Sequence, residues 1–285
     1  MLSQVLVMIV TQWALYCLLG LAFSLSFRVA GFFDLSIGAA FLLGGYSTWW
    51  AAQSVPLAAA FPIGIALAST VSILVGLWGV APLASRLPPL NMFVVTLGVL
   101  YFVQSLAALA FGESAKVLRS GPNPTFAVFS ARISFVQLFL VAAAVLVTLC
   151  LAYTLARSGW GRFARAIADD RHLADLLGVP IQNTLLKTYA TGGAIAGIAG
   201  SLFVADRALD PAQAMTVLLA AMVAAILGGE AILGAALGAL VLACLESGLG
   251  FVMPGFWKST VVFCILLAVL ALRGGGMFRF IRRKL

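Results

Sequence analysis

Apolar positions in this chain come in long, nearly unbroken runs that short polar stretches separate. Nine such segments can be drawn, with approximate limits 5–27, 35–53, 57–80, 91–111, 133–156, 184–205, 212–227, 231–252 and 258–272. Most approach the roughly 20 apolar residues that a helix needs to cross a hydrocarbon core. The seventh is short, which suggests a broken or re-entrant helix. The pattern predicts an all-α polytopic membrane protein of about 8–10 transmembrane helices in a single domain, 1–285.

The composition agrees with this class. The chain is 63% hydrophobic and 9% charged, whereas soluble globular proteins are about 25% charged. The net charge of +8 is typical of the basic cytoplasmic loops of membrane proteins. Basic and aromatic residues do not interleave on any polar surface, so no nucleic-acid partner is expected and membrane lipid is the natural surrounding. The four cysteines lie inside apolar runs without disulfide or metal spacing, so no metal site is expected.

Basic residues also predict the orientation. If 157–183 is a cytoplasmic loop and every segment crosses once, then 28–34, 81–90, 228–230 and a tail at 273–285 are cytoplasmic, and the polar loop 112–132 is external. The cytoplasmic side then holds Arg28, Arg86, Arg157, Arg162, Arg165, Arg171, Lys187, Arg273, Arg279, Arg282, Arg283 and Lys284. The external side holds Lys116, Arg119, Arg132, Arg207 and Lys258. This excess fits the positive-inside rule and places the N-terminus outside and the C-terminus inside.

One short polar stretch, GRFARAIADDRHLADLLGVP at 161–180, carries six charged residues and the only histidine. Residues 164–177 have helical periodicity, and Gly178 and Pro180 end the pattern. Its apolar positions share one face: Ala164, Ile167, Ala168, Ala174 and Leu177. Arg165 and Asp169, and likewise Arg171 and Asp175, are four residues apart and hence neighbours on a helix surface.

This spacing predicts one short amphipathic helix on the cytoplasmic side. It is either a solvated connector or a helix that docks on a partner. The docking interpretation has two supports. The apolar face has no obvious core of its own, and charges of both signs suit a protein surface better than anionic lipid.

The stretch resembles the cytoplasmic coupling loop of permease subunits in ATP-binding-cassette importers for branched-chain amino acids. The family pattern is Gly-Arg, a small residue, Arg-Ala, an Ala and an Asp, and then Leu-Leu-Gly. The matching candidates for coupling to an ATPase are Gly161, Arg162, Arg165, Ala166, Ala168, Asp170, Ala174, Leu177 and Gly178, with Leu176 and Val179 beside them. The resemblance implies that this helix sits in a cleft of a cytoplasmic ATPase and transmits its closure.

The resemblance extends over residues 10–275. Residues 91–104 are similar to the family's Thr-x-Gly span, through Thr96, Gly98 and Gln104. Residues 226–247 are similar to its glycine-rich segment, through Gly228, Gly229, Gly234, Gly238 and Glu246. After the glycine pair, Glu230 and Ala231 replace the usual Gly-Ser and the segment is one residue shorter. The loop geometry there is expected to differ from the family pattern.

Polar residues inside the membrane suggest a solute path. Asp34 opens a segment with Ser36 and Gly38 just after it. It either caps a helix N-terminus or marks a broken helix that exposes backbone amides to the solute. Asp210, before Pro211, opens another segment on the opposite side. The two aspartates therefore suggest an inverted repeat with two broken helices, a hypothesis that requires equivalent places in the fold.

Other intramembrane residues have alternative interpretations. Glu246, within an apolar run, is either a functional buried acid or lies near the outer interface. Thr96 completes the candidate path. The pairs Gly193 and Gly197, and Gly234 and Gly238, are small-xxx-small spacings typical of close helix packing.

The expected function is an importer subunit without its own ATPase site, because none of the four lysines follows glycine as a Walker A loop requires. The chain is therefore not expected to be an enzyme. The resemblance implies four kinds of partner: a second related permease, two cytoplasmic ATP-binding subunits that hold ATP and magnesium, and an extracytoplasmic solute-binding protein. It also implies a multi-pass location in the bacterial inner membrane.

The expected solute is a branched-chain or other apolar amino acid. Urea, a short amide and a sugar-like solute remain alternatives, since Asp-Leu-Ser-x-Gly at 34–38 is closer to sugar-type importers of the same superfamily. A stand-alone ion-coupled transporter is the alternative of another class, with Asp34, Asp210 and Glu246 as its candidate sites. An intramembrane enzyme would need a nucleophile with a base or a metal cluster, and the sequence suggests neither.

Overall fold

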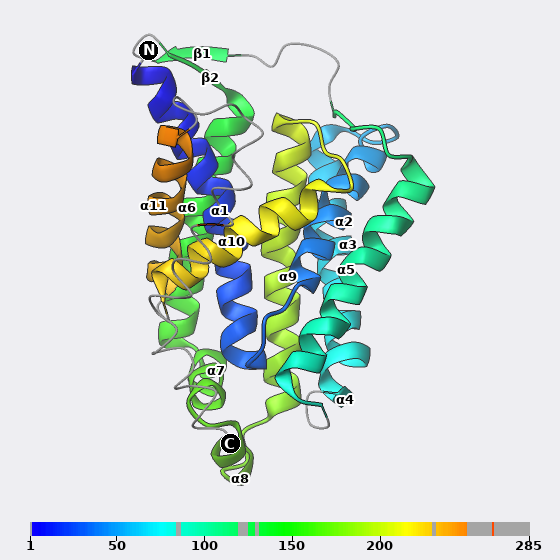
Figure 1. Ribbon diagram of the computed structural model, residues 1–285, viewed down its shortest axis with the longest axis vertical. Coiled ribbons are helices and arrows are strands. Elements are labelled where there is room, and N and C mark those ends of the chain that lie inside the picture. The colour runs from blue at the N-terminus through cyan, green and yellow to red at the C-terminus, as the bar shows by residue number, and fades with distance from the viewer. Residues whose placement is uncertain are drawn as a thin grey trace.

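The computed structural model describes residues 2–83, 87–118, 125–128, 131–229, 232–249 and 264. Within these residues the chain is almost entirely helical, which confirms the predicted all-α class (Figure 1). The helices are α1 (Leu2–Ala30), α2 (Ser36–Ala51), α3 (Leu57–Leu74), α4 (Ala81–Leu83), α5 (Pro89–Phe111), α6 (Phe135–Arg157), α7 (Gly159–Asp169), α8 (Arg171–Leu176), α9 (Ile181–Asp206), α10 (Gln213–Gly228) and α11 (Ile232–Leu249). A π-helical turn η1 (Val75–Val80) joins α3 to α4, and β1 (Thr125–Val128) pairs antiparallel with β2 (Ala131–Ser134).

Five helical runs among the described residues are long and apolar enough to cross a membrane. They are Gln4–Ala30, Leu57–Leu83, Pro89–Phe111, Phe135–Arg157 and Ile181–Asp206. α10 and α11 form a sixth span if they are taken together, and they are bent by 119° at their break. The described part of the chain thus provides fewer spans than the predicted eight to ten.

The assumption that every apolar segment crosses once is wrong for α2, α10 and α11. α2 has 16 residues, which at 1.5 Å per residue is about 24 Å and too short for a full crossing. The bend between α10 and α11 confirms that the seventh segment belongs to a broken or re-entrant element. The joint between them therefore does not follow the predicted alternation. The ninth segment, the tail 273–285, and Glu230 and Ala231 lie outside the described residues.

α9 lies at the centre of the bundle and contacts α1, α2 and α3 (Figure 1). Within the most apolar window of α9, 72% of the residues are buried, compared with 22% for the run Leu57–Leu83 and 22% for α6. Small residues let the backbones approach: a Cβ on Gly44 would lie 2.6 Å from the Cα of Gly197. Gly193 and Gly197 pack against Ser72 and Ala68 of α3 in the same way. Close helix packing at this small-xxx-small pair is therefore confirmed.

The α10–α11 pair is held by the same kind of contact. Gly234 lies directly against Gly228, and Gly238 against Ala224, backbone to backbone. This confirms the packing role of Gly234 and Gly238. Gly229, with φ of 73°, adopts a left-handed conformation that glycine tolerates and that ends α10.

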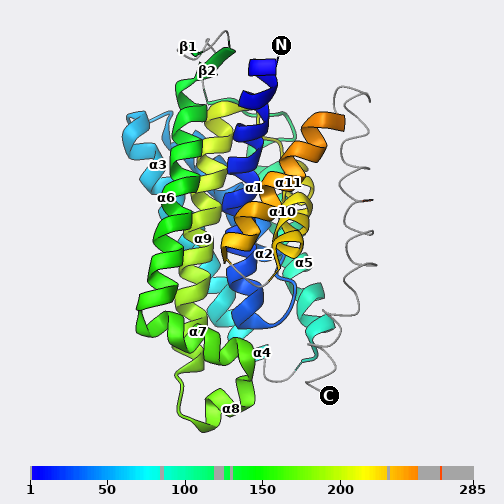
Figure 2. The same ribbon diagram turned by 90° about the vertical axis from the view of Figure 1, so that its left-hand side faces the viewer.

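The same order of elements occurs twice in opposite directions. α1 is followed by a non-helical link at 31–35 and then by the 16-residue α2. α9 is followed by a non-helical link at 207–212 and then by α10, also of 16 residues. α1 and α9 run antiparallel (Figures 1 and 2). Asp34 and Asp210 each lie in a link just before the short helix, so they occupy the equivalent places that an inverted repeat requires.

The described basic residues fall at the predicted ends of the bundle. Arg28, Arg157, Arg162, Arg165, Arg171 and Lys187 lie at the end formed by α7 and α8, and Lys116, Arg132 and Arg207 at the opposite, outer end (Figure 1). Arg86, Arg119, Lys258 and the five basic residues of the tail lie outside the described residues.

The loop after α5 covers the outer end, as its polarity predicts. The backbone of Lys116 forms an isolated antiparallel bridge with Leu209 in the link before α10, through hydrogen bonds of 2.8 and 2.9 Å. The Lys116 ammonium lies 5.5 Å from the centre of the Trp49 ring. The loop is therefore fixed both to the second link and to the end of α2.

Candidate functional site

The segment predicted as one amphipathic helix consists of two helices, α7 and α8. The prediction is wrong at Asp170, whose backbone is extended with φ of −152°. Its carboxylate accepts hydrogen bonds from the backbone N–H groups of His172 and Leu173, at 2.9 and 3.0 Å. Asp170 is thus the N-cap of α8, a position at which aspartate is strongly favoured. α7 is capped in turn by Ser158, whose hydroxyl accepts from the Gly161 N–H at 3.1 Å.

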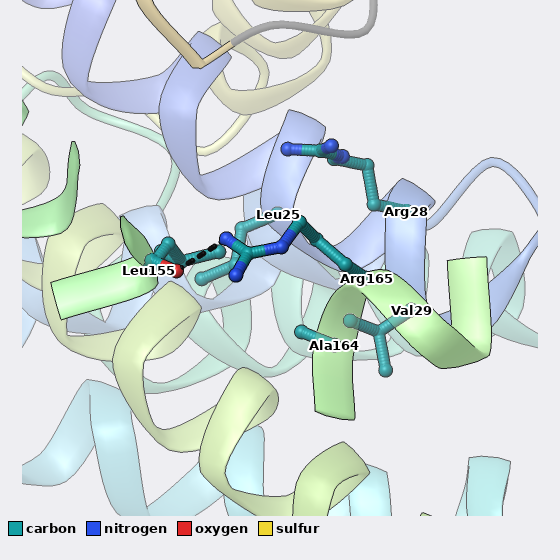
Figure 3. Close-up of a pocket in the computed structure, with 6 residues that line it drawn as sticks. All are labelled: Leu25, Arg28, Val29, Leu155, Ala164 and Arg165. Carbon is teal, nitrogen blue, oxygen red and sulfur yellow. Dashed lines mark hydrogen bonds between the residues drawn. The ribbon is translucent and has the colours of Figure 1, made fainter. Parts of the chain in front are cut away.

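α7 packs onto its own bundle, a contact that the sequence pattern does not predict. Gly161, Ala164 and Ile167 are buried. A small, partly open space beneath the helix is lined by Leu25, Arg28, Val29, Leu155, Ala164 and Arg165 (Figure 3). A Cβ on Gly161 would collide with the backbone of Leu155. The expectation that the apolar face has no core of its own is therefore wrong for α7, because α1 and α6 cover it.

Arg165 joins α7 to the end of α6. Its Nη1 donates a hydrogen bond to the carbonyl oxygen of Leu155 at 2.6 Å (Figure 3). The last carbonyls of a helix lack partners within it and carry partial negative charge, so a guanidinium there stabilises the helix end. Arg165 forms no ion pair with Asp169 among the described residues, where Arg207–Asp206 is the sole salt bridge. The predicted surface pair is replaced by this inward contact.

α8 presents its side chains mostly to the exterior. Ala174 is buried, as predicted, whereas Leu177 is 75% exposed and does not share its face. The reason is that α8 ends at Leu176 and Gly178 turns the chain with φ of 75°, which confirms the predicted helix stop. Leu173 and Leu176 are also exposed. Partial burial lowers the pKa of the Arg171 guanidinium, and the Asp175 carboxylate acts in the opposite direction.

The remaining coupling candidates on α7 are at least partly exposed. Arg162 is exposed on α7, and Ala166 and Ala168 are half-buried. The candidates therefore divide into residues that hold α7 to the bundle and residues that α8 displays. Gly161, Ala164 and Arg165 belong to the first group, and the leucines at 173, 176 and 177 to the second.

Replacing Asp170 with alanine is expected to loosen α8 and leave α7 intact. Loss of an N-cap costs about 1 kcal/mol of helix stability, which is large for a helix of six residues. Hydrogen–deuterium exchange of the purified permease checks this, with faster exchange expected at 172–177 only. Asp169→Ala is the matched control, since Asp169 caps no helix. Equal protection of α8 in both variants would contradict the assignment of the cap.

The structure gathers four of the candidate path residues around the first link. The Asp34 Oδ1 atom accepts hydrogen bonds from the Ser36 N–H at 2.9 Å and from the Ser36 hydroxyl at 2.6 Å. The Leu35 N–H donates to the hydroxyl of Thr96 on α5 at 3.3 Å. Gly38 lies against Leu100 of α5 and Leu218 of α10. The capping interpretation of Asp34 thus accounts for one carboxylate oxygen.

The second oxygen of Asp34, Oδ2, has no partner at hydrogen-bond geometry among the described residues, although Asp34 is 0% exposed. The Tyr189 hydroxyl of α9 interacts with this carboxylate more weakly. A buried carboxylate oxygen without a partner is unfavourable, so it needs an explanation beyond helix capping. The link therefore combines a satisfied cap with an unsatisfied buried atom.

Asp210 and Glu246 lie apart from this cluster. Asp210 is half-buried in the second link, and its Oδ1 accepts from the Gln213 N–H at 3.0 Å. Glu246 accepts a hydrogen bond of 2.6 Å from the Tyr16 hydroxyl, which itself accepts from the Gln12 amide at 2.7 Å. The Gln12 carbonyl oxygen accepts from Arg207 at 3.0 Å. This network ties α11 to α1 and leads to the outer end, the alternative place predicted for Glu246.

The network includes one residue, Tyr16, that no motif in the sequence marks as functional. Tyr16 lies four residues after Gln12 on α1, so the two could be predicted to share a face. The partner Glu246 is 230 positions away along the chain, and one sequence offers no signal for that pairing. Among the described residues, no group of three or more His, Cys, Asp or Glu side chains could hold a metal ion.

Comparison with known families decides what kind of protein carries these features. The family model described as branched-chain amino acid transport system / permease component matches residues 5–270. The chain belongs to this family. This match confirms the predicted resemblance to permease subunits of branched-chain amino acid importers.

Full-length relatives of the permease carry the same description. It is 28% identical to the high-affinity branched-chain amino acid transport system permease protein BraD of Pseudomonas aeruginosa, over 96% of this chain and 94% of BraD. It is 26% identical to the permease protein LivH of the corresponding Escherichia coli system, over 94% of this chain and 92% of LivH.

A relative with another solute is similar over less of its length. The fructose import permease protein FrcC of Rhizobium meliloti is 27% identical over 85% of this chain and 69% of FrcC. No solved structure is significantly similar to the chain.

Proposed function

We propose that this permease forms half of the membrane path of an ATP-driven importer for branched-chain or other apolar amino acids. The observation that carries the proposal is the coupling loop, which combines an inner helix fixed to α1 and α6 with an outer helix that displays leucines. A second related permease completes the path, two cytoplasmic subunits bind ATP and magnesium, and an external binding protein delivers the solute. The location is the bacterial inner membrane, with the α7–α8 end in the cytoplasm.

The geometry suggests how ATP hydrolysis elsewhere moves this chain. When the cleft of the ATPase closes around α8, it contacts Leu173, Leu176 and Leu177, which are apolar and exposed. Gly161 and Arg165 prevent α7 from moving without α6. α7 contacts α1 near its end, where Ala164 lines one small space with Leu25 and Val29, close to the link that holds Asp34. This chain provides part of the solute path and the two helices that transmit the movement, and the partner subunits hydrolyse ATP.

The amino-acid solute is supported by the names of BraD and LivH, which cover nearly the whole chain. A sugar is the second candidate, because Asp-Leu-Ser-x-Gly at 34–38 resembles sugar-type importers and FrcC is named for fructose. A path lined by apolar and small residues suits either an uncharged or a zwitterionic solute.

The deciding experiment is purification of the permease from its native membrane in mild detergent, with mass spectrometry of the proteins that accompany it. An ATPase with a Walker A loop and a second permease are expected. Replacing the exposed Leu173 and Leu176 with aspartate should release the ATPase and retain the second permease. His172→Asp is the matched control, because His172 is also exposed on α8 and receives the same charge without loss of a leucine. A permease that purifies alone or only with copies of itself would contradict the proposal.

The solute is identified by measuring which compounds the external binding protein of the importer binds. Isothermal titration of that protein with leucine, isoleucine, valine, urea and fructose distinguishes the candidates. Uptake into vesicles that contain the whole complex must then show the same preference. Tight binding of fructose alone would replace the amino acid as solute and leave the importer intact.

A further inference from the structure

A series of three hydrogen bonds runs from the outer end of α9 through α1 to α11. The Arg207 guanidinium donates to the Gln12 carbonyl oxygen at 3.0 Å, and the Gln12 amide donates to the Tyr16 hydroxyl at 2.7 Å. The Tyr16 hydroxyl donates in turn to the Glu246 carboxylate at 2.6 Å. All three bonds point the same way, from a cation to an anion, so each bond polarises and strengthens the next.

Tyr16 is the most buried member of this series. It is 4% exposed, whereas Gln12 and Glu246 are half-buried and Arg207 is exposed. The Tyr16 hydroxyl both accepts and donates, so phenylalanine at this position would break the series in the middle and keep the packed ring. Its loss would also remove a donor from an acid that lies within an apolar helix, where unpaired carboxylates are unfavourable.

A second hydrogen bond joins the same two helices. The Trp13 indole N–H of α1 donates to the Ala236 carbonyl oxygen at 2.9 Å. Ala236 lies near the start of α11 and Glu246 near its end, so α11 is attached to α1 at two separate points. Packed apolar helices can slide over one another by small shear movements. The two directional bonds therefore fix the register of α11 on α1, which apolar packing alone leaves free.

α11 is in turn connected to the candidate solute path through α10. Gly228 and Gly234 meet backbone to backbone where the α10–α11 pair is bent, so a shift of α11 is passed to α10. Leu218 of α10 lies against Gly38, one of the candidate path residues. The position of α11 therefore affects how α10 lies on the path.

The other end of α1 lies beside α7. Leu25 and Val29 of α1 line one small space with Ala164 of α7, and the two helices are in contact (Figure 3). Leu25 lies about 14 Å from Tyr16 along the helix axis, at 1.5 Å per residue. Because α1 is one uninterrupted helix, Leu2–Ala30, the same rigid element contacts α7 at its inner end and holds α11 nearer its outer end.

We propose that Tyr16 is a positioning residue for transport: it fixes α11 to α1, so that the bent α10–α11 pair follows α1 when α7 is displaced. The inference rests on the proposed function and deepens it by naming the side chain that connects movement of α7 to the solute path. Cohesion of the bundle does not depend on this contact, because α1 also packs directly on α10 through Gly20 against Ala221 and Ala224. The hydrogen bond of Tyr16 instead determines the register in which α11 moves.

The test is a double-mutant cycle in the complete complex, reconstituted in lipid vesicles with its binding protein. The variants are Tyr16→Phe, Glu246→Leu and their combination. Glu246→Gln is the conservative variant, because its amide oxygen still accepts a hydrogen bond from Tyr16. Tyr153→Phe is the matched control, because Tyr153 is 69% exposed on α6 and undergoes the same chemical change. The readouts are solute transported per ATP hydrolysed and the thermal unfolding midpoint of the purified permease.

Tyr16→Phe and Glu246→Leu are each expected to lower the transport per ATP about fivefold, the size of one polar contact between membrane helices. Each should also lower the unfolding midpoint, because it leaves a polar partner unpaired. The combined variant removes both polar groups, so its midpoint should return close to that of the wild type. Its transport per ATP should stay about fivefold low, because α11 is still not fixed in register. Glu246→Gln is expected to recover most of the transport that Glu246→Leu loses.

A combined variant that recovers transport together with the midpoint would overturn the inference, because the contact would then be purely structural. Glu246→Gln with the same loss as Glu246→Leu would also overturn it, because the effect would then belong to the charge and not to the hydrogen bond. If Glu246→Leu does not assemble, Tyr16→Phe decides alone, and transport equal to that of Tyr153→Phe would overturn the inference. A wild-type complex without ATP-driven uptake would instead refute the proposed function.

Discussion

Replacing Gly161 with valine is expected to reduce ATP-driven uptake about tenfold or more. The added side chain has no space, because the first carbon alone would meet the carbonyl and Cα atoms of Leu155. Overpacking of this kind displaces backbone and costs about 1–3 kcal/mol. α7 would lift from the end of α6, and Arg165 would lose its 2.6 Å hydrogen bond to Leu155. The measurement is solute uptake into vesicles with the whole complex, alongside ATP hydrolysis.

Gly159→Ala is the control for this prediction. A Cβ at Gly159 meets only the end of the Arg162 side chain, at 3.9 Å, so the same loop accepts it without movement. Near-normal uptake in Gly159→Ala and lost uptake in Gly161→Val would show that seating of α7 is required. If Gly161→Val transported normally, the contact between α7 and α6 would have no part in coupling.

Replacing Gly200 with valine is expected to destabilise the permease by about 3 kcal/mol, the upper range for overpacking. Gly200 lies where α9 crosses α2, and a Cβ there would collide with the carbonyl oxygen of Phe41 and approach the Gly45 nitrogen. Both atoms belong to the helix backbone, so no side-chain rotation can relieve the clash. Equilibrium unfolding of the purified permease in mixed micelles measures the loss.

Gly98→Ala provides the comparison, because nothing lies within 4 Å of its added carbon. Alanine favours a helix over glycine by about 1 kcal/mol, so this variant should be as stable as the wild type or slightly more so. Equal stability of Gly200→Val and the wild type would contradict the close crossing of α2 and α9.

The helices and the family could be predicted from the sequence for a simple reason. The apolar runs are long, and the segment 161–180 interrupts them with a dense polar motif. The limits of α1, α5, α6 and α9 follow from run length. Run length also locates α2, since the predicted limits 35–53 lie within two residues of Ser36–Ala51.

The site was predicted in part. Asp34, Ser36 and Thr96 do come together, and the two link aspartates occupy equivalent places. The break at Asp170 had a local signal, because aspartate is a preferred N-cap, but an uninterrupted helical period concealed it. The hydrogen bond between Tyr16 and Glu246 had no such signal, because the two residues are 230 positions apart along the chain.

The backbone bridge between Lys116 and Leu209 has a mechanical consequence at the outer surface. Two backbone hydrogen bonds between Lys116 and Leu209 hold the loop after α5 and the link before α10 together. A soluble protein that presses on this loop displaces the residue next to Asp210 without inserting any group among the helices. Movement of this loop is therefore passed to the second link through the backbone alone.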